Sequence, residues 1–387
     1  MNQFDQTINR KKTQSVKWDT IEETYHQEGL LPMWVADMDF KAPEAVRSAF
    51  QAYLDQGVFG YSIVPDSLYE AIISWQKKRH NFSVKKEDIL LNSGVVPSMA
   101  LSVQAYTNPG DTVLIHDPVY PPFAEVVKEN DRKLIRSQLS TEDKFAMNFA
   151  EMERLIQEED VKLFILCNPH NPGGRVWSKE ELQQIGDICK KHHVIVVSDE
   201  IHQDIVYQPE TFTTFQNAEP SFKDFSIVLT AATKTFNLAG IKNSMVFIKN
   251  AELKQAFEKV QKQNQQNGIN TFGIIGTQAA YEEGAEWLDS LLDYLKENIE
   301  FTYNFFQKEL PNVQLSKPEA TYLMWLDFSA YPLTDKQLEE KIVNEAKVVL
   351  NPGISYGSQG SQHMRINIAC PRATLKEGLE RIAGAFK

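Results

Sequence analysis

One pattern recurs between residues 89 and 250 and limits the folds open to this chain: a short apolar run, polar residues directly after it, and then a helical segment. Several runs show no alternation of apolar and polar residues, which predicts strands buried on both faces, as parallel strands are beneath helices. Strands that alternate with helices predict right-handed crossovers and a doubly wound α/β sheet. The runs are Ile89–Leu91, Val113–Ile115, Leu163–Cys167, Val194–Val197, Ile227–Leu229 and Met245–Ile248.

Amphipathic patterns predict helices around and between these runs. Residues 44–54 place their apolar side chains on one helical face. Residues 66–79 predict a second helix with Asp66 as its N-cap. Ser178 and Glu181 predict a capping box at the start of a third helix. The predicted inner positions of the three helices are Ala45, Val46, Ala49, Phe50, Tyr53, Leu54, Leu68, Ala71, Ile72, Trp75, Leu182, Ile185 and Cys189.

A smaller α+β domain is predicted at the C-terminal end, after a long helix that begins near residue 286. We therefore predict three parts: an N-terminal arm of residues 1–47, a large domain of residues 48–288 and a small domain of residues 289–387. The predicted elements of the small domain are strand Tyr322–Asp327, helix 335–346, strand Val348–Leu350, strand Met364–Ala369 and helix 374–386.

Charge and composition exclude several classes of protein. The 40 basic and 52 acidic side chains give a net charge of −12, whereas a nucleic-acid-binding protein needs a basic face. No segment approaches the roughly 18 apolar residues of a membrane span, and the polar N-terminus lacks the apolar stretch of a signal peptide. Cys167, Cys189 and Cys370 lie far apart, which predicts reduced thiols and a cytoplasmic protein. We predict no nucleic-acid or membrane partner and no metal site.

Polar side chains follow five of the predicted strands. In a doubly wound sheet the active site lies at the carboxyl ends of the strands, so these residues are predicted to meet at one edge. The segments are Asn92–Val96, Asp117–Tyr120, Asn168–Gly174, Ser198–His202 and Thr230–Lys234.

The residue types at this edge suit one cofactor, pyridoxal 5′-phosphate (PLP). Its aldehyde needs a lysine amine for a Schiff base, which Lys234 can supply. Its pyridine nitrogen needs an acid, which Asp199 can supply, and its phosphate needs a cradle. The turn at Ser93 and Gly94, before a predicted helix, can offer backbone N–H groups to a phosphate. The sequence contains no dinucleotide or P-loop motif to compete with this interpretation.

Motifs of this chemistry are spread over nearly the whole chain. They are Ser93-Gly94, Tyr120, Asn171–Gly174, Asp199-x-x-His202, residues 233–240 (TKTFNLAG) and Arg365-x-Asn367. In this order they resemble the class I/II PLP-dependent enzymes of fold type I. Three further segments, Trp34–Phe40, Asp199–His202 and Ala369–Arg372, look like the MalY/PatB subgroup of cystathionine β-lyases.

The resemblance implies roles around the cofactor ring. Lys234 would be the Schiff-base lysine and the base at the substrate Cα, and Asp199 would pair with the pyridine nitrogen. Asn171 would hydrogen-bond the pyridine oxygen, and Tyr120 would stack on the ring. His202 stands where many relatives have a tyrosine.

The resemblance also implies phosphate and substrate contacts. Arg365 would bind the substrate α-carboxylate, with Ala36 and Tyr356 also at the substrate. The implied phosphate contacts are Ser93, Gly94, Val95, Val96, Thr233, Lys242 and, from the neighbouring subunit of a homodimer, Tyr61.

Two positions depart from the pattern of the relatives. Ala231 replaces a common serine, and Lys242 replaces a common arginine. Thr230, Thr233 and the backbone at Val95 and Val96 are candidates to fill the lost contacts.

Structural roles remain alternatives for the same residues. Lys234 suits an exposed surface, Asp199 a helix N-cap, His202 and Tyr61 ordinary packing, and Arg365 a surface ion pair.

The implied activity is β-elimination from cystathionine or another cysteine S-conjugate, giving a thiol, pyruvate and ammonia. An aminotransferase that passes the amino group to a 2-oxo acid is the alternative, because it uses the same lysine, acid and arginine. A regulatory binding protein is a third alternative, for which the sequence reveals no surface.

Overall fold

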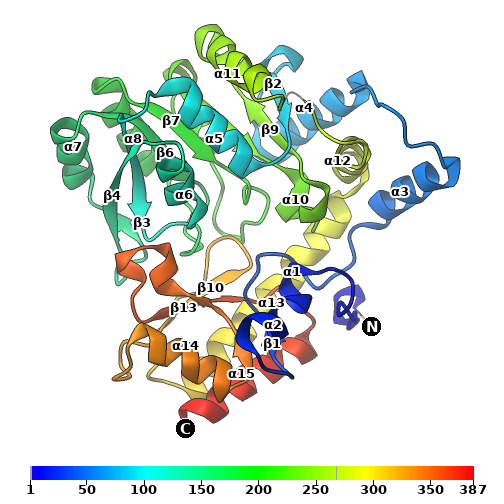
Figure 1. The fold of residues 1–387 in the computed structure, drawn as a ribbon, viewed down its shortest axis with the longest axis vertical. Coiled ribbons are helices and arrows are strands. Elements are labelled where there is room, and N and C mark those ends of the chain that lie inside the picture. The colour runs from blue at the N-terminus through cyan, green and yellow to red at the C-terminus, as the bar shows by residue number, and fades with distance from the viewer. Residues whose placement is uncertain (1, 267) are drawn as a thin grey trace.

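The computed structural model describes residues 2–266 and 268–387, and its larger part is built on an eight-stranded sheet (Figure 1). In spatial order the strands are β2 (Ile89–Asn92), β9 (Ser244–Phe247), β8 (Ser226–Thr230), β7 (Ile195–Asp199), β6 (Val161–Cys167), β3 (Thr112–Asp117), β4 (Lys133–Ser140) and β5 (Ala146–Met147). The five strands from β8 to β4 in this order run parallel, whereas β9 is antiparallel to both of its neighbours and β5 is antiparallel to β4.

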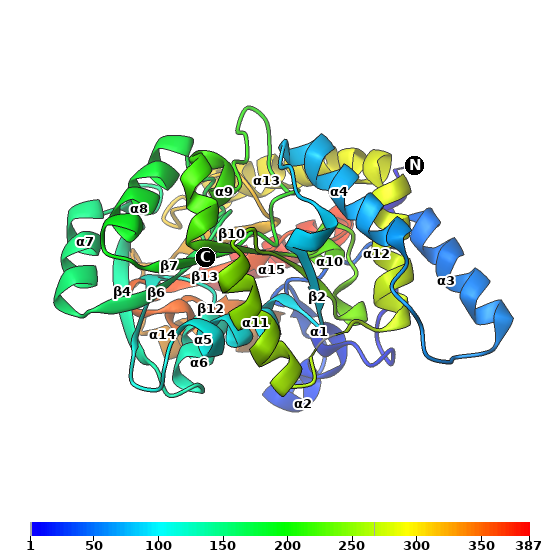
Figure 2. The same ribbon diagram turned by 90° about the horizontal axis from the view of Figure 1, so that it is seen from above.

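Helices cover both faces of this sheet, as Figure 2 shows from above. The covering helices are α5 (Val95–Tyr106), α6 (Pro122–Lys128) and α11 (Ala251–Gln263) on one face, and α7 (Phe149–Glu158), α8 (Lys179–Lys191) and α9 (Phe215–Ala218) on the other. Successive residues of β6 pack on opposite faces: Leu163 and Ile165 point toward α5 and α11, whereas Phe164 and Leu166 point toward α7 and α8. The prediction of a doubly wound sheet is therefore confirmed.

Two predictions about this sheet and its helices need correction, and one strand was missed. The run at residues 245–248 is a strand, but an antiparallel one. The missed strand is β4, which is only partly buried and contains no continuous apolar run. Asp66 is the first residue of α4 (Asp66–His80) and not its N-cap, which is Pro65 without a side-chain bond. The capping box of Ser178 and Glu181 is confirmed at α8.

Two more helices stand beside the sheet, toward its β2 end (Figure 1). α3 (Glu44–Gln56) packs against α12 (Thr271–Glu283), which also contacts α4. The predicted inner face of α3 is wrong in part, because only Val46 is fully buried and Leu54 is 46% exposed. Phe50 and Tyr53 are half-buried against Phe272 of α12, so Leu54 alone of this face is exposed. The chain continues from α3 into the loop that precedes α4.

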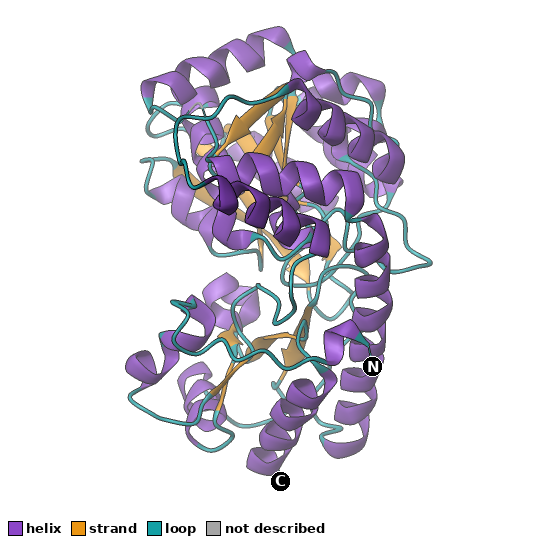
Figure 3. Cartoon of the chain, turned by 90° about the vertical axis from the view of Figure 1, so that its right-hand side faces the viewer, coloured by secondary structure: helices purple, strands orange, loops and turns teal. Residues whose placement is uncertain are grey.

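The C-terminal part is built on a three-stranded antiparallel sheet, joined to the large sheet by the long helix α13 (Ala285–Glu309) (Figures 1 and 3). N-terminal residues take part here, because β1 pairs with β11 in parallel. The domain limits at residues 48 and 289 stay predictions. The elements are α1 (Val16–Asp19), α2 (Ile21–Tyr25), β1 (Leu31–Pro32), β10 (Leu323–Asp327), α14 (Asp335–Asn344), β11 (Val348–Val349), β12 (Asn351–Pro352), β13 (His363–Asn367) and α15 (Arg372–Phe386).

Within the described residues, every helix is either too short or too polar to cross a lipid bilayer.

Candidate active site

Strand direction brings the predicted polar segments to one edge of the large sheet. β3, β6, β7 and β8 run in the same direction, so their carboxyl ends share an edge. β2 joins them there because it is antiparallel to β9, which is itself antiparallel to β8. α10 (Ala232–Thr235), which carries Lys234, begins two residues after β8 ends.

A cavity of about 590 Å³ opens at this edge. It brings together all predicted site residues except Tyr61, Thr230, Arg365 and Tyr356. Its lining consists of Ala36, Ser93, Gly94, Val95, Val96, Pro97, Tyr120, Cys167, Asn171, Asp199, Ile201, His202, Thr233, Lys234, Ala239, Lys242 and Asn243.

Lys234 points its amine across the cavity toward the N-terminal segment. Its Nζ donates a hydrogen bond of 2.7 Å to the backbone carbonyl of Ala36, which also accepts one from the Tyr322 hydroxyl at 2.9 Å. Burial, and then the positive charge of Arg365, lower the pKa of Lys234 to about 8. The exposed surface position is thus excluded, and the amine is a base suited to neutral pH.

Asp199, the last residue of β7, is buried, and no ion pair joins it to another of the described residues. Its Oδ1 accepts a 3.1 Å bond from the backbone N–H of Ile201, in a turn and not at the start of a helix. Burial raises the pKa of Asp199 to about 7, although the Ile201 N–H and the charge of Lys234 oppose the shift. A cationic group brought into the cavity would stabilise its carboxylate.

His202 and Asn171 line the cavity near this acid. Burial, and then the charges of Lys234 and Arg365, lower the pKa of His202 to about 3, so its ring is neutral, and its buried Nδ1 has no partner among the described residues. Asn171 accepts a 3.1 Å bond from Arg365 at its Oδ1, and its backbone carbonyl accepts one from the Tyr120 N–H at 3.1 Å.

The start of α5 lines the cavity with backbone N–H groups of the kind that bind anions. Val95 and Val96 occupy the first helical turn, where backbone N–H groups have no helical acceptor. Gly94 has φ of 154°, and a Cβ there would lie 3.3 Å from Pro97 Cδ. Lys242 adds a positive charge at the cavity wall.

Two side chains near the cradle already have partners. The Ser93 hydroxyl donates to Gln266 Oε1 at 2.8 Å. Thr230 was a candidate phosphate contact, but it does not line the cavity, and its hydroxyl donates to the backbone carbonyl of Glu200 at 3.1 Å.

Arg365 lies behind the cavity and is 2% exposed, which excludes a surface ion pair. Its guanidinium donates only to neutral oxygens among the described residues: Asn171 Oδ1 at 3.1 Å, Trp34 O at 2.9 Å and Asn351 Oδ1 at 2.9 Å. It stands 5.2 Å over the ring of Tyr356, which is also buried. A buried guanidinium with neutral partners suits a carboxylate ligand.

Tyr61 lies outside the site. It belongs to the loop between α3 and α4 and is fully exposed. A single chain therefore does not bring it to the cavity.

Five lining residues were not singled out from the sequence: Pro97, Cys167, Ile201, Ala239 and Asn243. Cys167 and Ile201 stand at or just after strand ends, so the rule that found the other residues applies to them as well.

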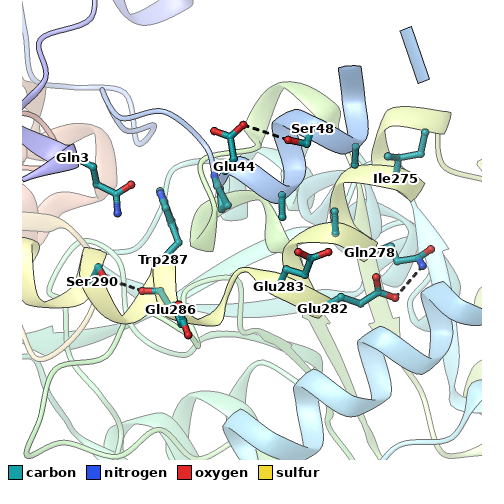
Figure 4. Close-up of a pocket in the computed structure, with 14 residues that line it drawn as sticks. Gln3, Glu44, Ser48, Ile275, Gln278, Glu282, Glu283, Glu286, Trp287 and Ser290 are labelled. Carbon is teal, nitrogen blue, oxygen red and sulfur yellow. Dashed lines mark hydrogen bonds between the residues drawn. The ribbon is translucent and has the colours of Figure 1, made fainter. Parts of the chain in front are cut away.

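A larger cavity, about 890 Å³, lies elsewhere, between α3, α12 and α13 (Figure 4). It contains none of the predicted site residues, and Glu44, Glu282, Glu283 and Glu286 make it acidic. An anionic phosphate would be repelled there, so the smaller cavity is the candidate site. Among the described residues no group of three or more acidic, histidine or cysteine side chains is close enough to hold a metal ion.

The sequence matches one known protein family over most of its length. Residues 31–382 match the aminotransferase class I and II family, and the chain belongs to this family.

Several relatives that are similar over the whole chain are carbon–sulfur lyases. Cystathionine β-lyase PatB of Bacillus subtilis is 42% identical, over 99% of both chains. Cystalysin of Treponema denticola, solved with a PLP cofactor, superposes with a TM-score of 0.97 at 34% identity over 100% of this chain and 99% of its own. The PLP-bound C–S lyase of Staphylococcus hominis gives 0.91 at 34% identity, over 99% and 98%.

Proposed function

We propose that this protein is a PLP-dependent carbon–sulfur β-lyase that cleaves cystathionine or another cysteine S-conjugate to a thiol, pyruvate and ammonia. One observation carries the proposal: a lysine amine and a buried carboxyl group line one cavity, and a buried arginine bonds to Asn171 of the same lining. The chain around them is 42% identical to a cystathionine β-lyase.

The residues of the cavity fit PLP. Lys234 offers an amine of lowered pKa for the aldehyde, and Asp199 offers a buried carboxyl group that forms no ion pair with the described residues. Val95 and Val96 offer N–H groups to the phosphate, and the buried Nδ1 of His202 has no partner in the described part of the chain. When bound, PLP supplies a ring that accepts the electron pair released at the substrate Cα.

The chain's own residues bind, orient and move a proton. Arg365 holds the substrate α-carboxylate, which fixes the Cα–H bond relative to Lys234. The Lys234 amine takes the Cα proton, and Asp199 in its ionised form holds a positive charge beside it. The Cβ–S bond then breaks, and the sulfur takes up the proton that Lys234 removed and leaves as the thiol. The remaining three-carbon fragment takes up one water and gives pyruvate and ammonia.

An aminotransferase is the second candidate, because the matched family is named for that activity. Incubation with L-cystathionine, with and without an added 2-oxo acid, separates the two. Pyruvate and homocysteine formed without the acceptor support the lyase. Turnover that depends on the acceptor, with transfer of the amino group to it, supports the aminotransferase and refutes the lyase.

We also propose a homodimer with shared active sites, in which Tyr61 reaches the phosphate of the neighbouring subunit. Exposed apolar side chains support it, because five of them lie within ten residues of sequence, at the end of α3 and in the following loop. They are Leu54, Val58, Phe59, Tyr61 and Ile63.

Mixing two variants tests the shared site. Tyr61→Ala and Lys234→Ala are each expected to be impaired alone. After exchange of subunits, the mixed dimer contains one site with both side chains intact, so an equal mixture regains about a quarter of wild-type activity. Mixtures that regain nothing, or a monomeric protein in sedimentation, contradict the proposal.

A cytoplasmic location is proposed as well. The three cysteines are all buried and unpaired, as is usual in a reducing compartment. Fractionation of cells that express the protein tests this location.

A further inference from the structure

We propose that Asp204 is a positioning residue for Lys234, acting through the hydroxyl of Thr235. The inference rests on the proposed function, in which Lys234 is the base. Asp204 lies two residues after His202, in the turn that follows β7, and does not line the active-site cavity. It is buried, with 1% of its side chain exposed.

The Asp204 carboxylate joins three segments of the chain. Its Oδ2 accepts a 2.7 Å hydrogen bond from the Thr235 hydroxyl, on α10. Its Oδ1 accepts a 3.0 Å bond from Trp75 Nε1 and lies 2.7 Å from His80 Nε2, both on α4. α4, the turn after Asp199 and the helix that carries Lys234 therefore meet at one carboxylate.

α10 needs such a link because it is only four residues long. A helix this short does not hold its own position, since one turn fixes many dihedral angles for very few hydrogen bonds. Side chains next to Lys234 provide the anchors: Thr235 binds Asp204, Phe236 packs edge-to-face on Trp75 with centroids 5.4 Å apart, and Asn237 binds the backbone of Met38.

The charge state of the Asp204 carboxyl group supports this role. Burial alone would raise the pKa of Asp204, but the charge and hydrogen bond of His80, with the bonds from Thr235 and Trp75, hold it below its ordinary value. The group is therefore a carboxylate acceptor and not a neutral acid. Hydrogen bonds to a charged acceptor are stronger and more directional than neutral ones.

The placement of Lys234 matters for catalysis because an error of about 1 Å in a reacting group can lower a rate about 100-fold. Thr235→Val tests the link with the least disturbance, because it keeps the shape of the side chain and leaves Asp204 paired with His80. Thr235→Ser restores a hydroxyl. Thr302→Val is the matched control, since the buried Thr302 hydroxyl donates to the Asn298 carbonyl at 2.8 Å within α13, far along the chain from Lys234.

The measurements are kcat, KM, melting temperature, cofactor content and the pH midpoint of the cofactor's visible absorption band. Thr235→Val is expected to lower kcat by about tenfold or more, with KM changed less than about twofold, and to shift the pH midpoint. Thr235→Ser is expected to return both kcat and the midpoint close to wild type. Thr302→Val is expected to lower the melting temperature without changing either.

Two results would overturn the proposal. One is a Thr235→Val enzyme with wild-type kcat and midpoint. The other is a loss of kcat that Thr235→Ser does not restore or that Thr302→Val reproduces. Because β-elimination and transamination both need Lys234, kcat is read on whichever reaction the wild type catalyses. Failure of the lyase proposal therefore shows in the wild type alone and leaves the comparison of variants intact.

Discussion

At the scale of single residues, the site consists of charged groups that the chain buries without neutralising. Asp199 has a pKa raised to about 7 by burial, Lys234 has one lowered to about 8 by burial and by Arg365, and Arg365 donates to neutral oxygens. Each would gain stabilisation from a group of opposite charge. This pattern is what a site prepared for a zwitterionic cofactor and an anionic substrate requires.

Asp199→Asn tests the acid. The carboxamide keeps the shape but cannot hold a positive charge, so kcat is expected to fall about 100- to 1,000-fold. Cofactor content and melting temperature, measured beside kcat, show whether the fold is intact. Activity within a few-fold of wild type means that another acid performs this role.

Variants of Arg365 distinguish a role in substrate binding from a purely structural role. Arg365→Ala is expected to raise KM strongly for every amino-acid substrate and to lower kcat, because the carboxylate contact also orients Cα–H toward Lys234. Arg365→Lys restores function only in part, since an ammonium lacks the bidentate fork. A lower melting temperature with unchanged kinetics would instead place the carboxylate contact elsewhere.

At the scale of elements, the sequence rules succeeded where one strand and the residues after it carried the information. The unalternating runs predicted the buried strands, and strand-end positions predicted Ser93, Tyr120, Asn171 and Asp199 at one cavity. They failed where neighbouring strands decide the outcome: β4 is only partly buried, and β9 runs antiparallel to its neighbours.

Contacts between distant segments were equally hidden from pattern reasoning. Arg365 reaches Asn171 across 194 positions of sequence, and no local pattern encodes that distance. No local pattern encodes the partners of the Asp204 carboxylate either, because Asp204 lies in a turn and Trp75 and Thr235 lie on α4 and α10.

The start of α5 can be tested as an element. Gly94→Ala adds a Cβ at φ of 154° and 3.3 Å from Pro97 Cδ, so the turn must shift and the first N–H groups of the helix move with it. We expect weaker PLP binding, about tenfold or more in Kd, measured by titrating cofactor-free protein. Gly384→Ala is the matched control, because a Cβ there meets no atom within 4 Å in α15. Equal Kd values for the two variants would remove the cradle assignment.

At the scale of the whole molecule, buried histidines couple stability to pH. Burial lowers the pKa of His116 to about 4, and burial with the charge of His116 lowers that of His170 to about 3. The pKa of histidine in an unfolded chain is about 6.5, so below that pH the unfolded chain binds more protons than the folded one. The stabilising contribution is therefore complete above about pH 6.5 and is lost as pH falls toward 4 and 3.

His116→Phe checks this coupling. Both ring nitrogens of His116 are buried and make no side-chain hydrogen bond among the described residues, and its neighbours Phe164 and Trp177 are aromatic. Between pH 6 and 4.5 the free energy of unfolding of wild type should fall more steeply than that of the variant, by up to about 1.4 kcal/mol per pH unit. Asp199 and Glu200, whose pKa values burial raises to about 7, are common to both proteins and cancel. Parallel urea-unfolding curves across this range would contradict the assignment.

The yield of pyruvate from L-cystathionine per active site, with no 2-oxo acid present, distinguishes β-elimination from transamination. A β-lyase regenerates its cofactor in each cycle, so we expect many equivalents of pyruvate at a constant rate, and none above background with Lys234→Ala. An aminotransferase stops after one equivalent of amino-group transfer until an acceptor is added. A reaction that ends at or below one equivalent would contradict the account.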